Sequence, residues 1–490
     1  MVRIRIPNGL LRSDQVRELA AISEEYGRGV ADITVRQNIQ LHWVTIENIP
    51  DLITRLQRIG LSTTGACGDV ARNVTGCPVA GIDSHELIDA SPFALAIDRD
   101  LGGNRDFYNL PRKFKISVTG CSSWCSYPEI NDVAFTVTTR KRNGATEVGF
   151  SVRIGGGLST EPHLAVKLNA FIRQYQVLVV ARGVAEIFRA SEVLRQSRDN
   201  ARLKYLFLKH GWTADSFLAE LQRQLGFSLD PAEPEEVPAD IHRDHTGVHR
   251  QKQPGLFYIG ASVSRGRITP EQLRKVADLA DAYGDGRVRA TVQQNILLVN
   301  IPEASVDRVV SELNLAGLPV SVSAFARGTV ACTGSEFCKL ALTETKGFAR
   351  WLSEQLEERL PGFQEQIKLH ITGCPNSCGQ HWIADIGIEG KKIKADGKMV
   401  DAYYFCVGGS VGQIASIARP VGYRCAATAV PDAIERLLSA YQEERSGNEN
   451  VREFLARHSN EEIRMVLAGE FVGAVERDLP AAIVPRGLEG

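Results

Sequence analysis

The sequence lacks an excess of charge of either sign, a long apolar run and a leader-like start. Its 57 Lys and Arg nearly balance 58 Asp and Glu, so we expect no bulk electrostatic binding to nucleic acid or to an anionic membrane. The apolar stretch at residues 177–180 is far shorter than the roughly 20 residues of a membrane-spanning helix. Residues 1–7 contain no apolar core of signal-peptide length. We therefore expect a soluble, cytoplasmic protein.

Cysteine is also sparse, because 10 residues in a chain of 490 are too few for a disulfide scaffold. Most of these cysteines nevertheless occur in close pairs, a pattern typical of metal binding in a reducing compartment. No G-x-G-x-x-G segment opens a helix, so we predict no flavin or nicotinamide domain within the chain. The composition, 43% apolar and 23% charged, is that of a globular protein with about three domains.

A long internal repeat organises the chain. Residues 14–27 recur as residues 271–284, and residues 34–39 recur as residues 291–296, both at an offset of 257. The matches continue in the same order further along, as Arg72-x4-Cys77 with Arg327-x4-Cys332 and as Thr119-Gly-Cys-x3-Cys125 with Thr372-Gly-Cys-x3-Cys378. The two halves are therefore duplicates, and each is predicted to fold in the same way.

Each half is predicted to contain a small and a large unit. After Ser13, apolar residues at helical spacing predict a helix, followed by an alternating strand over residues 33–43 and a second helix over residues 52–59. This content is typical of a ferredoxin-like fold. The remainder of each half alternates strands and helices, as in a larger mixed α/β domain, with strands at residues 113–118 and 367–371 and helices at residues 348–356 and 433–441.

The fold expected from these patterns is α+β and internally duplicated. Two ferredoxin-like half-domains would form one pseudo-twofold domain beside two larger mixed α/β domains. A charged, proline-rich stretch without apolar periodicity is predicted to link the halves. The expected boundaries are residues 1–65 and 66–227 for the first half, 228–254 for the linker, and 255–325 and 326–490 for the second half.

The most specific motif combines Cys332-x5-Cys338 with Cys374-x3-Cys378. Four thiolates are what a [4Fe-4S] cluster requires, and each pair lies in a stretch of small residues where backbone N–H groups can approach the sulfur atoms. A four-cysteine zinc site is the alternative, although zinc ligands are usually separated by two to four residues. We favour the cluster.

At these residues the sequence resembles the family of sirohaem-containing sulfite and nitrite reductases, and is most similar to assimilatory ferredoxin-dependent sulfite reductases. The resemblance extends over nearly the whole chain and includes residues 3–9, 34–40, 72–74, 110–115 and 345–346. It implies that Cys332, Cys338, Cys374 and Cys378 bind the cluster, with Cys378 bridging it to the sirohaem iron. It also implies that the two larger domains enclose the sirohaem.

The same resemblance implies an anion pocket made of Arg3, Arg72, Lys113 and Lys115. The two arginines can make paired hydrogen bonds to an oxyanion. Lysines crowded among cations should have lowered pKa values, which suits them to donate protons as oxygen leaves. A second set of basic and polar residues in the matching motifs is expected to hold the carboxylates of sirohaem, namely Arg36, Gln40, Thr34, Asn376 and Lys346.

The choice between sulfite and nitrite rests on Lys115. A Lys-x-Lys sequence after Leu-Pro-Arg is typical of the sulfite reductases in this family, and a further cation suits a dianion. We therefore expect the six-electron reduction of sulfite to sulfide in sulfur assimilation, with electrons from a ferredoxin or, less favoured, a flavoprotein subunit. A nitrite reductase and a non-catalytic iron–sulfur electron-transfer subunit are the alternatives.

The first half retains three cysteines of the motif, Cys77, Cys121 and Cys125, but has Asp83 where the second half has Cys338. Nearby Cys67 is a possible substitute. We expect these residues to be relic or buried thiols, with a second cluster or a redox-active Cys121/Cys125 pair as the alternative. Iron counting would distinguish them, because a second cluster doubles the cluster iron.

Overall fold

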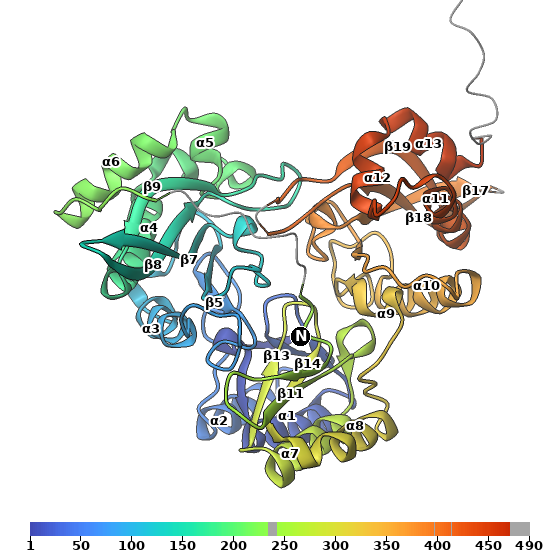
Figure 1. Ribbon diagram of the computed structural model, residues 1–490, viewed down its shortest axis with the longest axis horizontal. Helices are drawn as coiled ribbons and strands as arrows, with labels where there is room; N and C mark the ends of the chain where they lie inside the picture. Colours follow the sequence, from blue (N-terminus) through green and yellow to red (C-terminus); the bar gives the residue numbers. More distant parts are fainter. Residues whose placement is uncertain (234–242, 396, 413, 471–490) are drawn as a thin grey trace, which may run out of the picture.

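The computed structural model describes residues 1–233, 243–395, 397–412 and 414–470. Figure 1 shows three lobes. The lower lobe combines the first segments of both halves, and each upper lobe contains the remainder of one half. The predicted linker, residues 228–254, lies partly outside the described residues. Among the helices that are described, none has the length and apolarity needed to cross a bilayer.

The lower lobe contains two sheets that each half completes for the other. The first sheet has the order β1 (Val2–Ile4), β4 (Ile39–Leu41), β3 (Ala31–Ile33) and β12 (Arg267–Ile268). The second has the order β10 (Gly247–Arg250), β11 (Leu256–Ala261), β14 (Ile296–Pro302), β13 (Arg287–Ala290) and β2 (Leu10–Arg12). Because β12 and β2 have exchanged halves, the two ferredoxin-like units form one domain.

Four helices cover these sheets: α1 (Ser13–Tyr26), α2 (Ile49–Arg58), α7 (Pro270–Tyr283) and α8 (Val306–Leu315). Helices α1 and α7 pack against each other and share one buried core, to which Leu19 and Ile22 contribute from α1 and Val276 and Ala280 from α7. Apolar residues at helical spacing thus face a common interior, as the sequence predicted.

The strand expected over residues 33–43 is wrong, because β3 and β4 form a hairpin instead. The Thr34 N–H donates to the Asn38 carbonyl at 2.9 Å, and Gln37 has a positive φ of 59°. The Thr34 hydroxyl accepts the N–H groups of Arg36 and Asn38 at 3.3 and 3.1 Å. This side-chain capping of the turn outweighs the strand-like alternation.

The two upper lobes have the same sheet order and the same mixture of parallel and antiparallel pairs. The first contains β5 (Ala71–Gly76), β6 (Phe114–Thr119), β7 (Val133–Arg142), β8 (Ala145–Ile154) and β9 (Val166–Ile172). The second contains β15 (Thr329–Ala331), β16 (Leu369–Thr372), β17 (Ile386–Ala395), β18 (Lys398–Val407) and β19 (Arg419–Ala426). In each sheet the first three strands are parallel and the last two pairs antiparallel.

Helices pack beside these sheets. The first lobe has α3 (Ser91–Leu101), α4 (Val177–Ala190), α5 (Tyr205–Lys209) and α6 (Ala214–Leu225). The second has α9 (Ala324–Gly328), α10 (Lys346–Arg359), α11 (Val430–Glu444), α12 (Val451–Arg457) and α13 (Asn460–Ala468). The predicted α+β, internally duplicated fold is confirmed.

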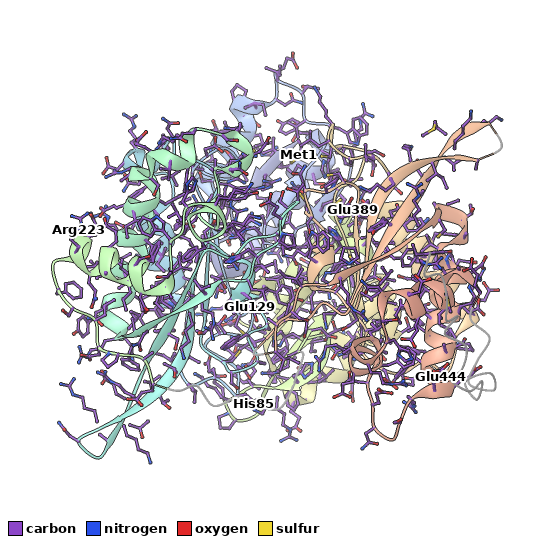
Figure 2. The ribbon with its side chains drawn as sticks, turned by 90° about the horizontal axis from the view of Figure 1, so that it is seen from above. Met1, His85, Glu129, Arg223, Glu389 and Glu444 are labelled. Carbon is purple, nitrogen blue, oxygen red and sulfur yellow. The ribbon has the colours of Figure 1, made fainter. Side chains whose placement is uncertain are left out.

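The upper lobes also contact each other. The Trp382 indole N–H donates to the Ser159 carbonyl at 2.9 Å, and a small core buries Leu158 of the first half with Ile383 of the second. Seen from above in Figure 2, Glu129 lies near the middle of the molecule, whereas Arg223 and Glu444 lie toward opposite ends. The loop that follows β8 in the first upper lobe therefore meets the loop that follows β16 in the second.

Candidate functional site

Two neighbouring strands position the four cysteines of the second half. Cys332 follows β15 and Cys374 follows the adjacent parallel strand β16, so both loops leave the sheet at its carboxyl edge, where open α/β sheets bind ligands. The Gly373 N–H donates to Cys332 Sγ at 3.2 Å, and the Asn376 amide donates to Cys374 Sγ at 3.6 Å. These donors are placed to stabilise thiolates.

The thiolate forms of these cysteines are unfavourable unless a cation lies among them. Burial raises the pKa of Cys332 and of Cys374, and the neighbouring Cys378 raises both further. Cys338 also contributes to the raised pKa of Cys374, so the four sulfurs are near enough to interact. A metal centre among them would remove this penalty, because the thiolate is the form that binds metal.

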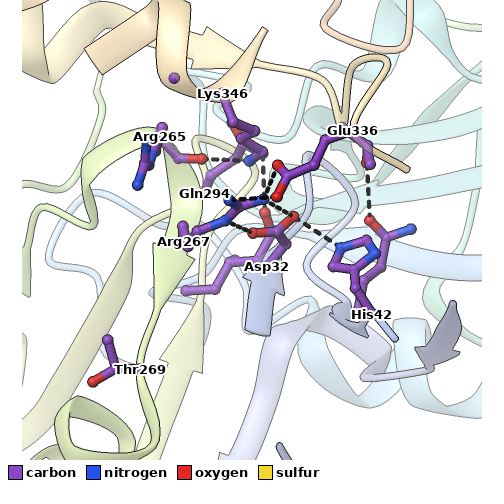
Figure 3. Close-up of polar contacts among 12 residues, drawn as sticks. Asp32, His42, Arg265, Arg267, Thr269, Gln294, Glu336 and Lys346 are labelled. Carbon is purple, nitrogen blue, oxygen red and sulfur yellow. Dashed lines mark hydrogen bonds and ion pairs between the residues drawn. The ribbon is translucent and has the colours of Figure 1, made fainter. Parts of the chain in front are cut away.

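The loop that carries Cys332 and Cys338 is anchored on the ferredoxin-like domain, as Figure 3 shows for its polar contacts. Arg267 of β12 donates to Asp32 at 3.0 Å and to Glu336 at 2.9 Å. The ring of His42 stacks on Phe337 with centroids 3.7 Å apart. Glu336 and Phe337 lie between the two cysteines, so residues from both halves fix this loop.

The four predicted anion-binding cations converge from separate elements of the first half. Arg3 lies on β1 and Arg72 on β5, and both guanidinium groups donate to the Ala66 carbonyl, at 2.9 and 3.2 Å. Arg72 also donates to the Gly68 carbonyl at 2.7 Å. Carbonyl partners orient a guanidinium without neutralising its charge. The group formed by Arg3, Arg72, Lys113, Lys115 and the adjacent Arg36 is called the cation cluster below.

Burial and mutual repulsion lower the pKa values of four cluster members, namely Arg36, Arg72, Lys113 and Lys115. The pKa of Lys113 falls to about 8, mainly through burial and then through Arg202. Burial is also the first cause of the lowered pKa of Lys115, followed by Arg202 and Arg36. The predicted lowering of both lysine pKa values is confirmed, with burial contributing more than crowding. Lys113 also interacts with Cys378, which places the cation cluster beside the exposed member of the thiol group.

Two of the residues expected to hold sirohaem lie within or against the cation cluster. Arg36 donates to Asn131 Oδ1 at 2.8 Å and to the Asn73 carbonyl at 2.5 Å, while its buried Nε has no partner in the described part of the chain. The Gln40 amide, oriented by its hydrogen bonds, places its oxygen 2.7 and 3.0 Å from the Arg3 guanidinium. Thr34 shapes the turn that carries Arg36.

The side chains of Lys346 and Asn376 donate hydrogen bonds to residues outside the cation cluster. The Lys346 ammonium donates to the Arg265 carbonyl, and Asp32 lies close enough to raise its pKa, although burial lowers it more (Figure 3). Asn376 is exposed and its amide faces Cys374. Both residues therefore lie near the thiol group of the second half.

Sequence reasoning missed Arg202. Its guanidinium donates to both oxygens of Asp132, at 3.1 and 2.8 Å, and both side chains are buried. Arg202 contributes to the lowered pKa of Lys113, Lys115 and Arg72. The internal repeat holds a signal for the aspartate that Arg202 pairs with, but not for Arg202 itself.

That signal is the pairing of Lys115 with Lys368 and of Asp132 with Asp385 at an offset of 253. The N–H of each lysine donates to its aspartate at 2.7 Å. In the second half the Lys368 ammonium also pairs with Asp385, at 3.1 Å. In the first half Asp132 forms its ion pair with Arg202 instead. Within the described residues the Lys115 ammonium has no ion-pair partner.

These residues fit the cofactors that the sequence implies. The four thiols suit an iron–sulfur cluster. The cation cluster is half-buried and has no ion pair to a carboxylate within the described residues, so it suits a macrocycle rich in carboxylates as well as an anionic substrate. The unpartnered Nε of Arg36 is a donor that a bound carboxylate would satisfy.

Comparison with known proteins agrees with this assignment. The family described as "Nitrite and sulphite reductase 4Fe-4S domain" matches residues 67–229 and 323–473, and "Nitrite/Sulfite reductase ferredoxin-like half domain" matches residues 1–59 and 249–316. The solved structure of the Mycobacterium tuberculosis NirA protein superimposes with a TM-score of 0.89 at 35% identity, covering 94% of this chain and 84% of that one.

Curated relatives bear the names of both activities. The assimilatory ferredoxin-dependent nitrite reductase of Haloferax mediterranei is 36% identical over 98% of this chain and 85% of its own length. The ferredoxin–nitrite reductase of Synechococcus elongatus is 39% identical over 89% and 85%. The ferredoxin sulfite reductase of Mycobacterium tuberculosis is 36% identical over 95% and 83%.

Proposed function

The chain belongs to the nitrite and sulfite reductase family, and from that premise we propose that it is an assimilatory, ferredoxin-dependent sulfite reductase. Oxidoreductases of this family carry sirohaem and a [4Fe-4S] cluster. In the proposal Cys332, Cys338, Cys374 and Cys378 would hold the cluster, and Cys378 would also contact the sirohaem. Arg36, Gln40, Thr34, Asn376 and Lys346 would hold the macrocycle. When bound, the two cofactors supply single electrons and the metal at which the substrate is reduced.

The protein supplies charge and protons to this reaction. Arg3 and Arg72 bind and orient the oxyanion through fixed N–H donors. Lys113 and Lys115 hold protons at their Nζ atoms and transfer them to the departing oxygens, which leave as water. Their lowered pKa values make them stronger acids than ordinary lysines and so suit them to this transfer near neutral pH.

The unpaired ammonium of Lys115 is the observation that favours sulfite. The matching Lys368 is neutralised by Asp385, whereas Asp132 forms its ion pair with Arg202 and not with the Lys115 ammonium. A cation kept unpaired in a buried pocket is costly, and a dianionic substrate compensates that cost better than a monoanion. The names of the relatives leave nitrite reduction as the second candidate, which needs less positive charge.

The substitution Lys115→Asn tests this proposal. With reduced ferredoxin as the donor, we expect kcat for sulfite to fall by roughly 100-fold or more, the usual contribution of a general acid, while nitrite turnover falls much less. Lys209→Asn, which alters an exposed ion pair outside the pocket, is the control. Unchanged sulfite turnover in Lys115→Asn would contradict the assignment of substrate.

The proposal also covers the electron donor and the domain boundaries. Relatives of both substrate types are named for ferredoxin, and we infer that a ferredoxin delivers the electrons here. We also retain the division into residues 1–65, 66–227, 228–254, 255–325 and 326–490, in which the end of the connection 228–254 contributes β10 (Gly247–Arg250) to the second sheet. Limited proteolysis of the holoenzyme, with the cleavage sites identified by mass spectrometry, tests these boundaries.

A further inference from the structure

The three cysteines that the first half retains converge on one buried point. Cys77 Sγ lies within 4.8 Å of Cys125 Sγ and of a His245 ring nitrogen, and it also lies within 4.8 Å of Cys121 Sγ and an Asp83 oxygen. All five side chains are buried. Cys67, the substitute considered from the sequence, is exposed and lies instead beside Arg72.

His245 comes from outside the duplicated motif and replaces the ligand that the first half has lost. Asp83 stands at the position of Cys338, but its carboxylate is engaged by Arg243 at 2.7 Å. His245 lies just before β10, and its Nδ1 is 3.1 Å from the Tyr258 hydroxyl. Its buried Nε2 has no hydrogen-bond partner within the described residues. One ring nitrogen is thus oriented by a neighbour while the other is left for a ligand, the arrangement typical of metal-binding histidines.

The close spacing of these groups favours one ion over a cluster. Bonds of about 2.3 Å from zinc to each sulfur place tetrahedral ligands about 4 Å apart. Cys77, Cys125 and His245 lie within 4.8 Å of one another, and Cys121 lies within 4.8 Å of Cys77. A cube of irons and sulfides holds its thiolates farther apart. Within the described residues this limit is met by Cys77, Cys125 and His245 together and by Cys77, Asp83 and Cys121 together, whereas no such group of three includes a cysteine of the second half.

We propose that Cys77, Cys121, Cys125 and His245 bind a single zinc ion, at a metal site distinct from the iron–sulfur cluster. Three thiolates and one imidazole in a closed, buried position form a typical structural zinc site. Arg289 donates to the Pro78 and Ala80 carbonyls at 3.0 and 2.7 Å. It lies near Cys77, so its positive charge helps to compensate the thiolates.

The zinc would join parts of the chain that are distant in sequence. Cys77 follows β5, Cys121 and Cys125 follow β6, and His245 belongs to the connection between the halves. Around them a small core includes Tyr258 of β11 and Leu297 and Val299 of β14. The ion therefore fixes the first large domain to the ferredoxin-like domain and to the start of the second half.

Metal analysis of the anaerobically purified holoenzyme tests the proposal. After an EDTA wash we expect one zinc per chain, and no more iron than one cluster and one sirohaem contain. Zinc that EDTA removes, zinc well below one per chain, iron sufficient for a second cluster, or a disulfide among these cysteines in peptide mass spectra would each overturn it. None of these outcomes depends on turnover, so a failure here is distinguishable from a failure of the proposed substrate.

The ligand set is tested by variants and by X-ray absorption. His245→Gln and Cys125→Ser should lose zinc and melt at lower temperature while retaining the sirohaem Soret band; full retention of zinc in both would overturn the assignment. Cys406→Ser, which alters a buried thiol near the Gly387 carbonyl, is the control and should keep zinc. For variants that do not fold, the zinc-edge spectrum of the unaltered protein decides. Three sulfurs at about 2.3 Å and one nitrogen at about 2.0 Å are expected, and four sulfurs or none would overturn the proposal.

Discussion

At the scale of single residues, the duplicated halves differ in whether matching cations are neutralised. Arg327 makes a two-pronged ion pair with Asp244, at 2.7 and 2.8 Å, whereas the matching Arg72 bonds to carbonyl oxygens. Lys368 is paired with Asp385, whereas Lys115 is not paired with Asp132. The duplication has therefore produced one half with paired cations and one with an unpaired cation cluster that can receive an anion.

Arg202 is predicted to control the acidity of Lys115. In Arg202→Gln a nearby positive charge is lost and Asp132 is freed, and both changes raise the pKa of Lys115 toward its ordinary value. If Lys115 donates a proton, the alkaline limb of kcat for sulfite should move up by about one pH unit or more, and the plateau should fall because the acid is weaker.

The pH dependence of kcat, measured on variants with equal sirohaem content, checks this prediction. Arg198→Gln is a suitable control, because Arg198 is exposed and pairs with Asp69 rather than with Asp132. The same alkaline limb in Arg202→Gln and in the unaltered enzyme would exclude this role of Arg202.

At the scale of elements, the repeated motif at residues 34–39 and 291–296 forms hydrogen bonds that connect the two halves. Gln37 donates to the Ala290 carbonyl at 3.0 Å and accepts the Gly76 N–H at 3.0 Å. The matching Gln294 donates to the Ile33 carbonyl at 2.9 Å and accepts the Ala331 N–H at 3.1 Å. Each buried amide thus satisfies a carbonyl in the other half and an N–H at the end of the first strand, β5 or β15, of a large-domain sheet.

Removing one of these amides should destabilise the fold without altering the anion pocket directly. Gln37→Ala leaves a buried carbonyl and a buried N–H without their partner, and each such group costs about 1–3 kcal/mol. We expect the free energy of unfolding to fall by about 2–5 kcal/mol, with a similar loss in Gln294→Ala. Chemical denaturation followed by far-ultraviolet circular dichroism measures both, and a change below about 0.5 kcal/mol in either variant would contradict this connecting role.

The sequence was informative about elements whose signal is local or repeated. Helix α1 and strand β6 follow from periodicity, and the cysteine spacing indicated the metal-binding loops. The sequence was uninformative where side-chain capping or a contact between distant residues determines the local structure or the role of a residue. The hairpin at Thr34 depends on side-chain capping, the role of Arg202 depends on its approach to Asp132 across 70 residues, and His245 joins the thiols from beyond the repeat. No local pattern carries that information.

At the scale of the whole molecule, exchanged strands make the halves mutually dependent. The first sheet of the ferredoxin-like domain is completed by β12 from the second half, and the second sheet by β2 from the first. The apolar faces of α1 and α7 cover each other. An isolated half would therefore expose strand edges and a large apolar surface, the features that promote aggregation.

Cutting the chain into residues 1–233 and 243–490 tests this dependence. Expressed alone, each fragment lacks a partner for an edge strand and for one face of a helix, so we expect insoluble protein or no cooperative thermal transition. Expressed together, with a purification tag on one fragment, they should co-purify in equal amounts and unfold in a single transition near that of the uncut chain. The reason is that the buried core formed by both halves is restored without the covalent link. A fragment that is soluble, monomeric and cooperatively folded by itself would show that strand exchange contributes little, and the ferredoxin-like units would then be independent domains that merely associate.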